Sequence, residues 1–136
     1  MKNLRGVMGL IAKLGLSLFL VTWSVIGVAQ TNDISQDELM RRINANQAGL
    51  ILDVRTPEEY AEGHVPGARN IPHDQLGSRL AELDAYKDKD IVLYCKSGRR
   101  AGIAANTLRA AGFSKLLHLD GDMNAWAGNG KLPIKK

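Results

Sequence analysis

Short apolar runs alternate with segments of helical pattern along most of this chain. The runs span residues 49–54, 89–95 and 115–120, and each is rich in Leu, Ile or Val. Such short continuous runs are typical of strands that are buried on both faces of a sheet. Strands that alternate with helices predict an α/β fold, in which helices cover both faces of a parallel sheet.

The intervening segments carry the local signals of helices. Ser35 precedes Glu38 by three residues, which is the pattern of a capping box, and Thr56 stands before Pro57 at a second predicted helix start. Gly112 follows a run of small residues, where a helix is expected to end. The helical segments are 34–43, 56–63, 74–86, 99–112 and 122–128, and a brief extended piece is expected at 67–72.

The N-terminal segment, residues 1–29, differs from the rest of the chain. A basic start is followed by an uncharged stretch at 14–29, and small residues stand before a polar, acidic segment. This pattern predicts a secretory signal peptide that is cleaved after Ala29, with one domain at 30–136. A retained membrane anchor is the alternative, although about sixteen uncharged residues are short for a span of roughly twenty. The predicted location is periplasmic or secreted.

Cleavage would change the charge of the folded part. The chain has 18 basic and 14 acidic side chains, and three of the basic ones, Lys2, Arg5 and Lys13, lie in the signal segment. The remaining 15 basic groups against 14 acidic groups leave a net charge of +1. The high isoelectric point is therefore no sign of nucleic-acid binding, which needs a basic patch on the folded part. We expect neither nucleic acid nor, after cleavage, a membrane as partner.

Cys95 is the only cysteine of the chain, and it ends the second apolar run. Cysteines usually pair in an oxidising compartment, which a single cysteine cannot do within its own chain. The carboxyl ends of parallel strands meet at one edge of a sheet, where ligands bind. We expect this edge to bring together Cys95, Asp53 with Arg55, and Asp120 with Gly121.

The loop that follows Cys95 suits a thiolate and an anion. Gly98 lets successive backbone N–H groups curve around one point at the start of a helix. Lys96, Arg99 and Arg100 add positive charge, which favours a thiolate over a thiol. The same groups would bind an incoming anion and stabilise an anionic leaving group. The alternative is an inert cysteine sealed in the core, whereas a reactive sulfur is expected to be open to solvent.

Three motifs resemble those of rhodanese-like sulfurtransferase domains. ILDVRTPEEYAEGHVPGARNIP at 51–72 is similar to their amino-terminal signature, and IVLYCKSGRRAGIAANTLRAAGF at 91–113 is similar to their active-site loop and helix. LDGDMNAW at 119–126 resembles their carboxyl-terminal signature. The resemblance covers the chain from about 33 to 132 and implies a five-stranded parallel sheet flanked by helices. A single such module behind an export signal resembles a small periplasmic thiosulfate sulfurtransferase.

The resemblance also implies a mechanism. Cys95 would attack the outer sulfur of thiosulfate or a similar donor and become a persulfide, and sulfite would leave. A thiophilic acceptor, cyanide or a thiol, would then take the sulfur. Substrate contacts would come from the loop residues Lys96, Ser97, Gly98, Arg99 and Arg100. This chemistry needs an activated thiolate but no cofactor, no metal and no separate general base.

Several other residues are expected to be structural. Asp53 and Arg55 should support the sheet edge and the neighbouring loops by hydrogen bonds rather than contact the substrate. His64 belongs to a predicted turn, and Tyr60 and Trp126 should pack in the core. With one cysteine and scattered histidines, the sequence does not predict a zinc site.

Two positions depart from the family pattern. Ala101 stands where many members carry Ser or Thr, so a hydroxyl near the loop is missing and the substrate preference stays open. Asp122 replaces the second of two glycines, and we expect its carboxylate to cap the last helix.

Three other functions fit the sequence less well than sulfur transfer. Phosphatase relatives of the fold place five residues between Cys and Arg, and the corresponding position here is Ala101, so a phosphoryl group would lack a bidentate guanidinium. Redox work on oxidised thiols lacks a resolving cysteine. A persulfide-carrying or partner-binding module with little turnover is the main alternative.

Overall fold

The computed structural model describes residues 31–136, and the predicted signal peptide at 1–29 lies outside this range. The elements in chain order are β1 (Asn32–Ile34), α1 (Gln36–Asn44), β2 (Leu50–Asp53), α2 (Pro57–Glu62), β3 (Arg69–Asn70), the 3₁₀ helices η1 (Leu76–Ser78) and η2 (Leu80–Tyr86), β4 (Ile91–Tyr94), α3 (Arg99–Ala110), β5 (Leu116–Leu119) and α4 (Asp122–Gly128). No helix within 31–136 is long and apolar enough to cross a membrane.

The strands form one sheet in the order β1-β5-β4-β2-β3, and every neighbouring pair is parallel. β4 lies at the centre, with β5 and β2 on its two sides. Each residue of β2 and β4 is buried, as the continuous apolar runs predicted. The expected α/β fold with a five-stranded parallel sheet is confirmed.

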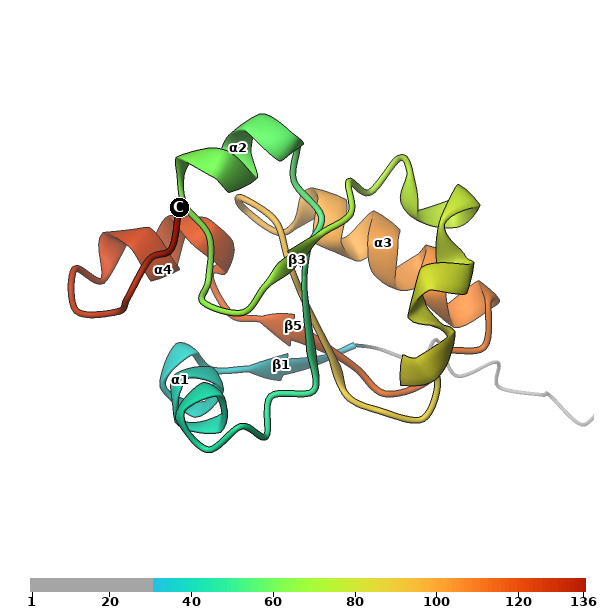
Figure 1. Ribbon diagram of the computed structural model, residues 1–136, viewed down its shortest axis with the longest axis horizontal. Coiled ribbons are helices and arrows are strands. Elements are labelled where there is room, and N and C mark those ends of the chain that lie inside the picture. Colours follow the sequence, from blue (N-terminus) through green and yellow to red (C-terminus); the bar gives the residue numbers. More distant parts are fainter. Residues whose placement is uncertain (1–30) are drawn as a thin grey trace, which may run out of the picture.

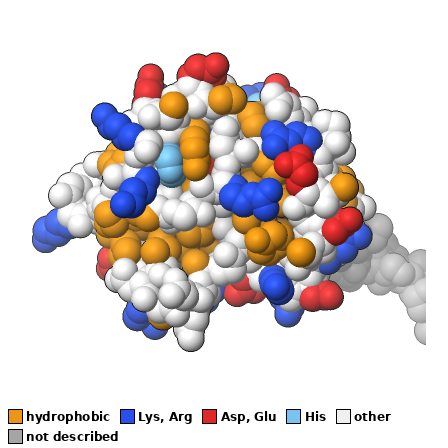
Figure 2. Space-filling model, in the orientation of Figure 1, with side chains coloured by type: hydrophobic (Ala, Val, Ile, Leu, Met, Phe, Trp, Pro, Cys, Tyr) orange, Lys and Arg blue, Asp and Glu red, His pale blue; other side chains and the backbone are white. Residues whose placement is uncertain are grey.

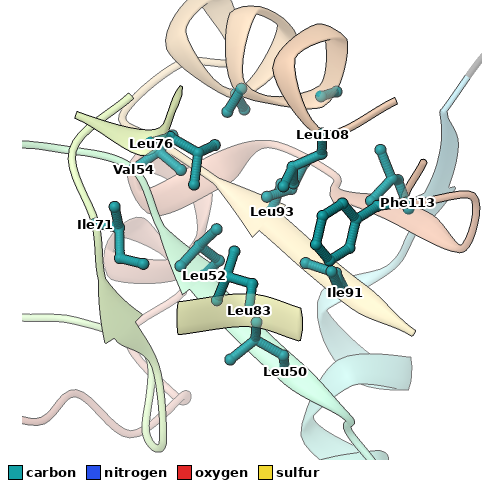
Figure 3. Packing of buried hydrophobic residues seen from close by; sticks show 14 of the residues in the cluster. Leu50, Leu52, Val54, Ile71, Leu76, Leu83, Ile91, Leu93, Leu108 and Phe113 are labelled. Atoms are coloured by element: carbon teal, nitrogen blue, oxygen red, sulfur yellow. The ribbon is translucent and has the colours of Figure 1, made fainter. Parts of the chain in front are cut away.

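Helices cover both faces of this sheet, with α3 and the 3₁₀ helices on one side and α1 and α4 on the other (Figure 1). Side chains from β2 and β4 alternate between the two layers, so Leu52 and Leu93 pack towards α3, whereas Ile51 and Val92 pack towards α1 and α4. Figure 3 shows the first cluster, in which Leu108 of α3 approaches Leu93. The two clusters are separate cores on the two faces of one sheet.

The predicted helix signals are confirmed except for the capping box at Ser35, which is half formed because the Glu38 carboxylate pairs with Arg42 instead of the Ser35 N–H. The Ser35 hydroxyl accepts a hydrogen bond from the Glu38 N–H at 3.1 Å. Thr56 and Glu59 form a complete capping box at the start of α2. Gly112 directly follows Ala111, the C-cap residue of α3, and has a positive φ of 92°. This is the left-handed conformation that commonly ends helices.

Two elements differ from the prediction. Residues 76–86 form two 3₁₀ helices rather than one α-helix, although Leu76 and Leu83 are buried as their spacing suggests. β1 was not predicted, because it is an edge strand of three residues in which only Ile34 is buried.

On the face shown in Figure 2, Lys and Arg side chains are interspersed with Asp and Glu side chains.

Candidate active site

The single thiol lies where the central strand passes into a helix. β4 ends at Tyr94, Cys95 follows it directly, and Gly98 is the N-cap of α3. The Gly98 N–H points back to the Cys95 Sγ at 3.0 Å. A donor aimed at sulfur stabilises the thiolate more than the thiol, because the ionised form is the stronger acceptor. Of the several backbone N–H groups expected around the sulfur, the structure shows this one in hydrogen-bond contact with it.

The first turn of α4 fixes the loop from behind. The Met123 N–H donates to the Cys95 carbonyl at 2.9 Å, and the Asn124 N–H donates to the Lys96 carbonyl at 3.1 Å. The Cys95 N–H donates to the Asp122 Oδ1 at 3.0 Å. Backbone groups on both sides of the sulfur are thus held by α4, which gives the loop a defined shape.

Asp122 does not cap the last helix, so that prediction is wrong. The N-cap is Gly121, and no side chain caps the helix. Asp122 is the first helical residue, has a positive φ of 54° and is only 1% exposed. Its carboxylate is used across the turn instead: besides the Cys95 N–H, it meets His118 Nε2, which lies 3.0 Å from both oxygens.

His118 is a site residue that the sequence did not reveal. It stands on β5 and is brought to the loop because β5 pairs with β4, with His118 opposite Leu93. Its Nδ1 lies 3.4 Å from the Asp33 carboxylate on β1. The hydrogen bond to Asp122 is the main cause that raises the pKa of His118 above its usual value. The histidine therefore favours its charged form at this position.

The loop cations divide into two groups. Arg100, the second residue of α3, makes a bidentate pair with Glu59 of α2, at 2.6 and 3.0 Å. This pair lowers the pKa of Glu59 to about 2, chiefly through the hydrogen bonds from Arg100. Lys96 and Arg99 are exposed and make no ion pair within residues 31–136. Lys96 and Arg99 are free to bind an anion, whereas the guanidinium of Arg100 is already paired with Glu59. Ser97 is exposed as well.

Asp53 and Arg55 form a buried pair beside this loop. Arg55 donates to both carboxylate oxygens of Asp53, with a shortest distance of 2.6 Å, and to the Gly63 carbonyl at 2.8 Å. Asn70 donates to the carbonyls of both residues. The pair joins β2 to α2 and β3, which confirms the expected supporting contacts by hydrogen bonds.

The expectation that the sulfur is open to solvent is wrong. Cys95 is only 1% exposed, because the loop folds over it and α3 covers it from one side. Burial alone is what an inert cysteine would also show. The feature that separates the two interpretations is polar: the sulfur is not surrounded by apolar groups only but accepts the Gly98 N–H.

A pocket of about 130 Å³ lies behind the loop. Its lining includes Gly98, His118 and Ala101, so the side chain that lacks the family's hydroxyl faces this pocket. Within residues 31–136 no cluster of His, Cys, Asp or Glu could hold a metal ion. His64 is buried and stacks on Tyr60 at 3.7 Å between ring centres, and Trp126 is fully buried, so the expected packing of Tyr60 and Trp126 is confirmed. His64 itself lies in a bridge to Lys135 rather than in a turn.

The fold and the loop define an α/β domain with one cysteine in a strand-to-helix turn. Residues 35–129 match the family of the rhodanese-like domain, and the chain belongs to this family. It is 38% identical to a sulfurtransferase of Allochromatium vinosum over 103 residues, which are 76% of this chain and 94% of that protein. A putative sulfur carrier protein of Bacillus subtilis, YrkF, is 34% identical over 96 residues. They make up 71% of this chain but only 51% of YrkF.

Solved structures agree with the family assignment. The crystal structure of a rhodanese-related protein from Thermoplasma volcanium superimposes with a TM-score of 0.65 and 27% sequence identity. The match covers 76% of this chain and 97% of that one. Family and relatives together indicate a transferase of sulfur.

Proposed function

We propose that this protein is a thiosulfate sulfurtransferase that carries sulfur as a Cys95 persulfide. The Cys95 thiolate attacks the outer sulfur of thiosulfate, and a new S–S bond forms while the S–S bond of thiosulfate breaks. Sulfite leaves with the electron pair of that bond. An acceptor, cyanide or a thiolate, then attacks the outer sulfur of the persulfide, and the Cys95 thiolate leaves. No external oxidant or reductant is needed, because sulfur moves between two nucleophiles.

The observation that carries this proposal is the Gly98 N–H that lies 3.0 Å from the Cys95 sulfur. The same donor would stabilise the terminal sulfur anion as it develops, in the manner of an oxyanion hole. Lys96 and Arg99 are exposed on the same loop and would attract the dianionic donor. Because Cys95 is 1% exposed, the loop must open for the donor to reach it.

Intact mass tests the proposal. Incubation with thiosulfate should add about 32 Da to the wild-type protein, the mass of one sulfur atom in a persulfide. Cys95→Ser should gain nothing, and cyanide should return the wild-type protein to its starting mass. Ser114→Ala is the control, because it removes an exposed hydroxyl outside the loop and leaves the nucleophile and the expected substrate contacts in place. A wild-type protein that never gains the mass would contradict the proposal.

A sulfur-carrying module with little turnover is the second candidate. The hold of Glu59 on Arg100 favours it, because the pair occupies one of the loop cations that would otherwise bind an anionic donor. The putative sulfur carrier name of YrkF points the same way. Steady-state assays separate the two: a persulfide that forms once but is not released to cyanide or to small thiols would favour the carrier, whereas repeated turnover would favour the enzyme.

We also propose export, with cleavage after Ala29. The support is the basic start and the uncharged stretch at 14–29. The protein recovered from cells should then begin at Gln30 and fractionate with the periplasm or the medium. A full-length chain recovered with the membrane fraction would favour a retained anchor instead.

A further inference from the structure

A carboxylate lies directly behind the loop that holds the sulfur. Asp122 Oδ1 accepts the N–H of Cys95 itself at 3.0 Å. On the other side, a Cβ at Gly98 would stand 3.2 Å from Asp122 Oδ2, so the carboxylate lies beside the residue whose N–H points at the sulfur. Asp122 is 1% exposed, and water screens its charge little at this depth.

A buried negative charge this close opposes the formation of a second one on the sulfur. Asp122 therefore works against the cations of the loop unless its own charge is balanced. The group that can balance it is His118, whose Nε2 lies 3.0 Å from both carboxylate oxygens. The side chain of His118 is 28% exposed, so it exchanges its proton with water.

Asp122 is the charged neighbour through which His118 can act on Cys95. From β1 the only charged neighbour is Asp33, which lies 3.4 Å from Nδ1 and is itself 69% exposed. The remaining lining of the pocket beside the ring carries no charge and comprises Thr31, Leu93, Gly98, Ala101, Gly102 and Ala105. Both carboxylates favour the imidazolium, and only that of Asp122 also contacts the Cys95 backbone.

We propose that His118 and Asp122 are positioning residues that set the reactivity of Cys95 through the charge of their pair. With a proton on His118 the pair is neutral, and the loop cations act on the sulfur unopposed. Without that proton the buried carboxylate is uncompensated, and it disfavours the thiolate. The inference rests on the proposed function only in that Cys95 reacts as a thiolate, and its test does not involve sulfur transfer.

The test is the pH profile of Cys95 alkylation by iodoacetamide in the full chain, whose only cysteine is Cys95. His118→Gln keeps a donor for Asp122 but removes the positive charge. Asp122→Asn keeps an acceptor for the Cys95 N–H and removes the negative charge, and Asn tolerates the positive φ at this position. We expect the midpoint of the profile in His118→Gln to lie about one pH unit above that in Asp122→Asn. In the double variant the midpoint should return to that of Asp122→Asn, because His118 acts through Asp122.

Controls are Asp120→Asn and His73→Gln, which make the same chemical changes on side chains that form no hydrogen bond or ion pair with the loop within residues 31–136; both should follow the wild type. Midpoints that coincide in His118→Gln and Asp122→Asn would overturn the inference, provided that circular dichroism shows both variants folded. If a variant does not fold, the midpoint of the wild-type alkylation profile is measured at low and at high salt instead. A change of this midpoint with salt that equals the change for a free thiol would also overturn the inference. Failure of persulfide formation with these shifts intact would contradict only the proposed function.

Discussion

Gly98 shows how much a single residue contributes to this site. Its φ of +113° is a conformation that side chains rarely adopt. A Cβ at this position would also stand 3.2 Å from Asp122 and 3.6 Å from the His118 ring. Both constraints have one origin, since the loop must turn sharply to aim the Gly98 N–H at the sulfur while its back lies against the carboxylate.

Gly98→Ala should therefore lower both stability and reactivity. The left-handed backbone alone costs about 1–2 kcal/mol for a residue with a Cβ, and relief of that strain would turn the N–H away from the sulfur. We expect a loss of about 1–2 kcal/mol in urea denaturation, together with slower persulfide formation.

Gly102→Ala is the matched control for this substitution. Gly102 lies in the first turn of α3, and nothing would stand within 4 Å of its Cβ. Because alanine is a better helix former, this variant should gain up to about 1 kcal/mol. Equal effects of the two substitutions would contradict the role assigned to Gly98.

At the scale of elements, buried and half-buried ion pairs join neighbours across the site. Arg55 links β2 to the end of α2 through Asp53 and the Gly63 carbonyl. Arg100 links α3 to the start of α2 through Glu59. α2 is thus tied at both ends, although none of its own residues is buried, and these ties hold it over the carboxyl edge of the sheet.

Removal of Arg55 should be the most costly of these changes. Arg55→Ala leaves the carboxylate of Asp53, which is 0% exposed, without its partner, and breaking a buried pair in this way costs about 3–5 kcal/mol. Arg69→Ala, on the exposed side of β3, is the control and should change the free energy of unfolding by less than about 0.5 kcal/mol. A small effect of Arg55→Ala in urea denaturation would mean that water replaces the guanidinium.

The pair of Glu59 with Arg100 predicts a pH dependence. In the folded protein the pKa of Glu59 is about 2, below the ordinary value of 4.5, so folding favours the ionised carboxylate. The contribution to stability is present above pH 4.5 and is lost as the pH falls towards 2. Glu59→Gln keeps the capping box, because glutamine also serves there, and removes only the charge.

We expect the difference in unfolding free energy between wild type and Glu59→Gln to be constant above about pH 5 and to shrink below it. Urea denaturation at a series of pH values measures this difference. Glu58→Gln, on the exposed side of the same turn, should show no such trend. A difference that does not depend on pH would mean that the ion pair adds nothing beyond a neutral hydrogen bond.

At the scale of the whole molecule, the sequence predicts what depends on continuous burial and misses what depends on the turn geometry. β2 and β4 are predicted because every residue in them is buried. β1 has one buried residue among three, and no period can be detected in so short an edge strand. The 3₁₀ helices place leucines at nearly the same positions as an α-helix would, so spacing alone does not separate the two.

The same limit applies to the site. Cys95, Gly98 and the loop cations are neighbours in the chain. Asp53 is predicted to lie near them because the carboxyl ends of parallel strands meet at one edge of the sheet. The pair of His118 and Asp122 spans the end of β5 and the start of α4, where the left-handed Gly121 and Asp122 reverse the chain. No periodicity predicts that a side chain from a strand meets one from the next helix, because a turn of two left-handed residues lies between them.

The C-terminal segment closes the molecule, and its removal is the last test. The chain returns to α2 (Figure 1), where His64 and Lys135 exchange two backbone hydrogen bonds of 2.9 and 3.0 Å. The Trp126 Nε1 donates to the Pro133 carbonyl at 2.9 Å. Deletion of 131–136 removes these three bonds, and each contributes about 1 kcal/mol. We expect urea denaturation to show a loss of about 2–4 kcal/mol.

Lys135→Pro separates the backbone bridge from the rest of the segment, because proline lacks the N–H that reaches His64. It should lose about 1 kcal/mol, whereas Lys136→Pro, one residue further on and exposed, should lose nothing. Since His64 stacks on Tyr60 of α2, a loosened bridge should also release α2 from the edge of the sheet. We therefore expect faster alkylation of Cys95 in the chain that lacks residues 131–136 than in the wild type. An unchanged rate would mean that α2 is held by its ion pairs alone.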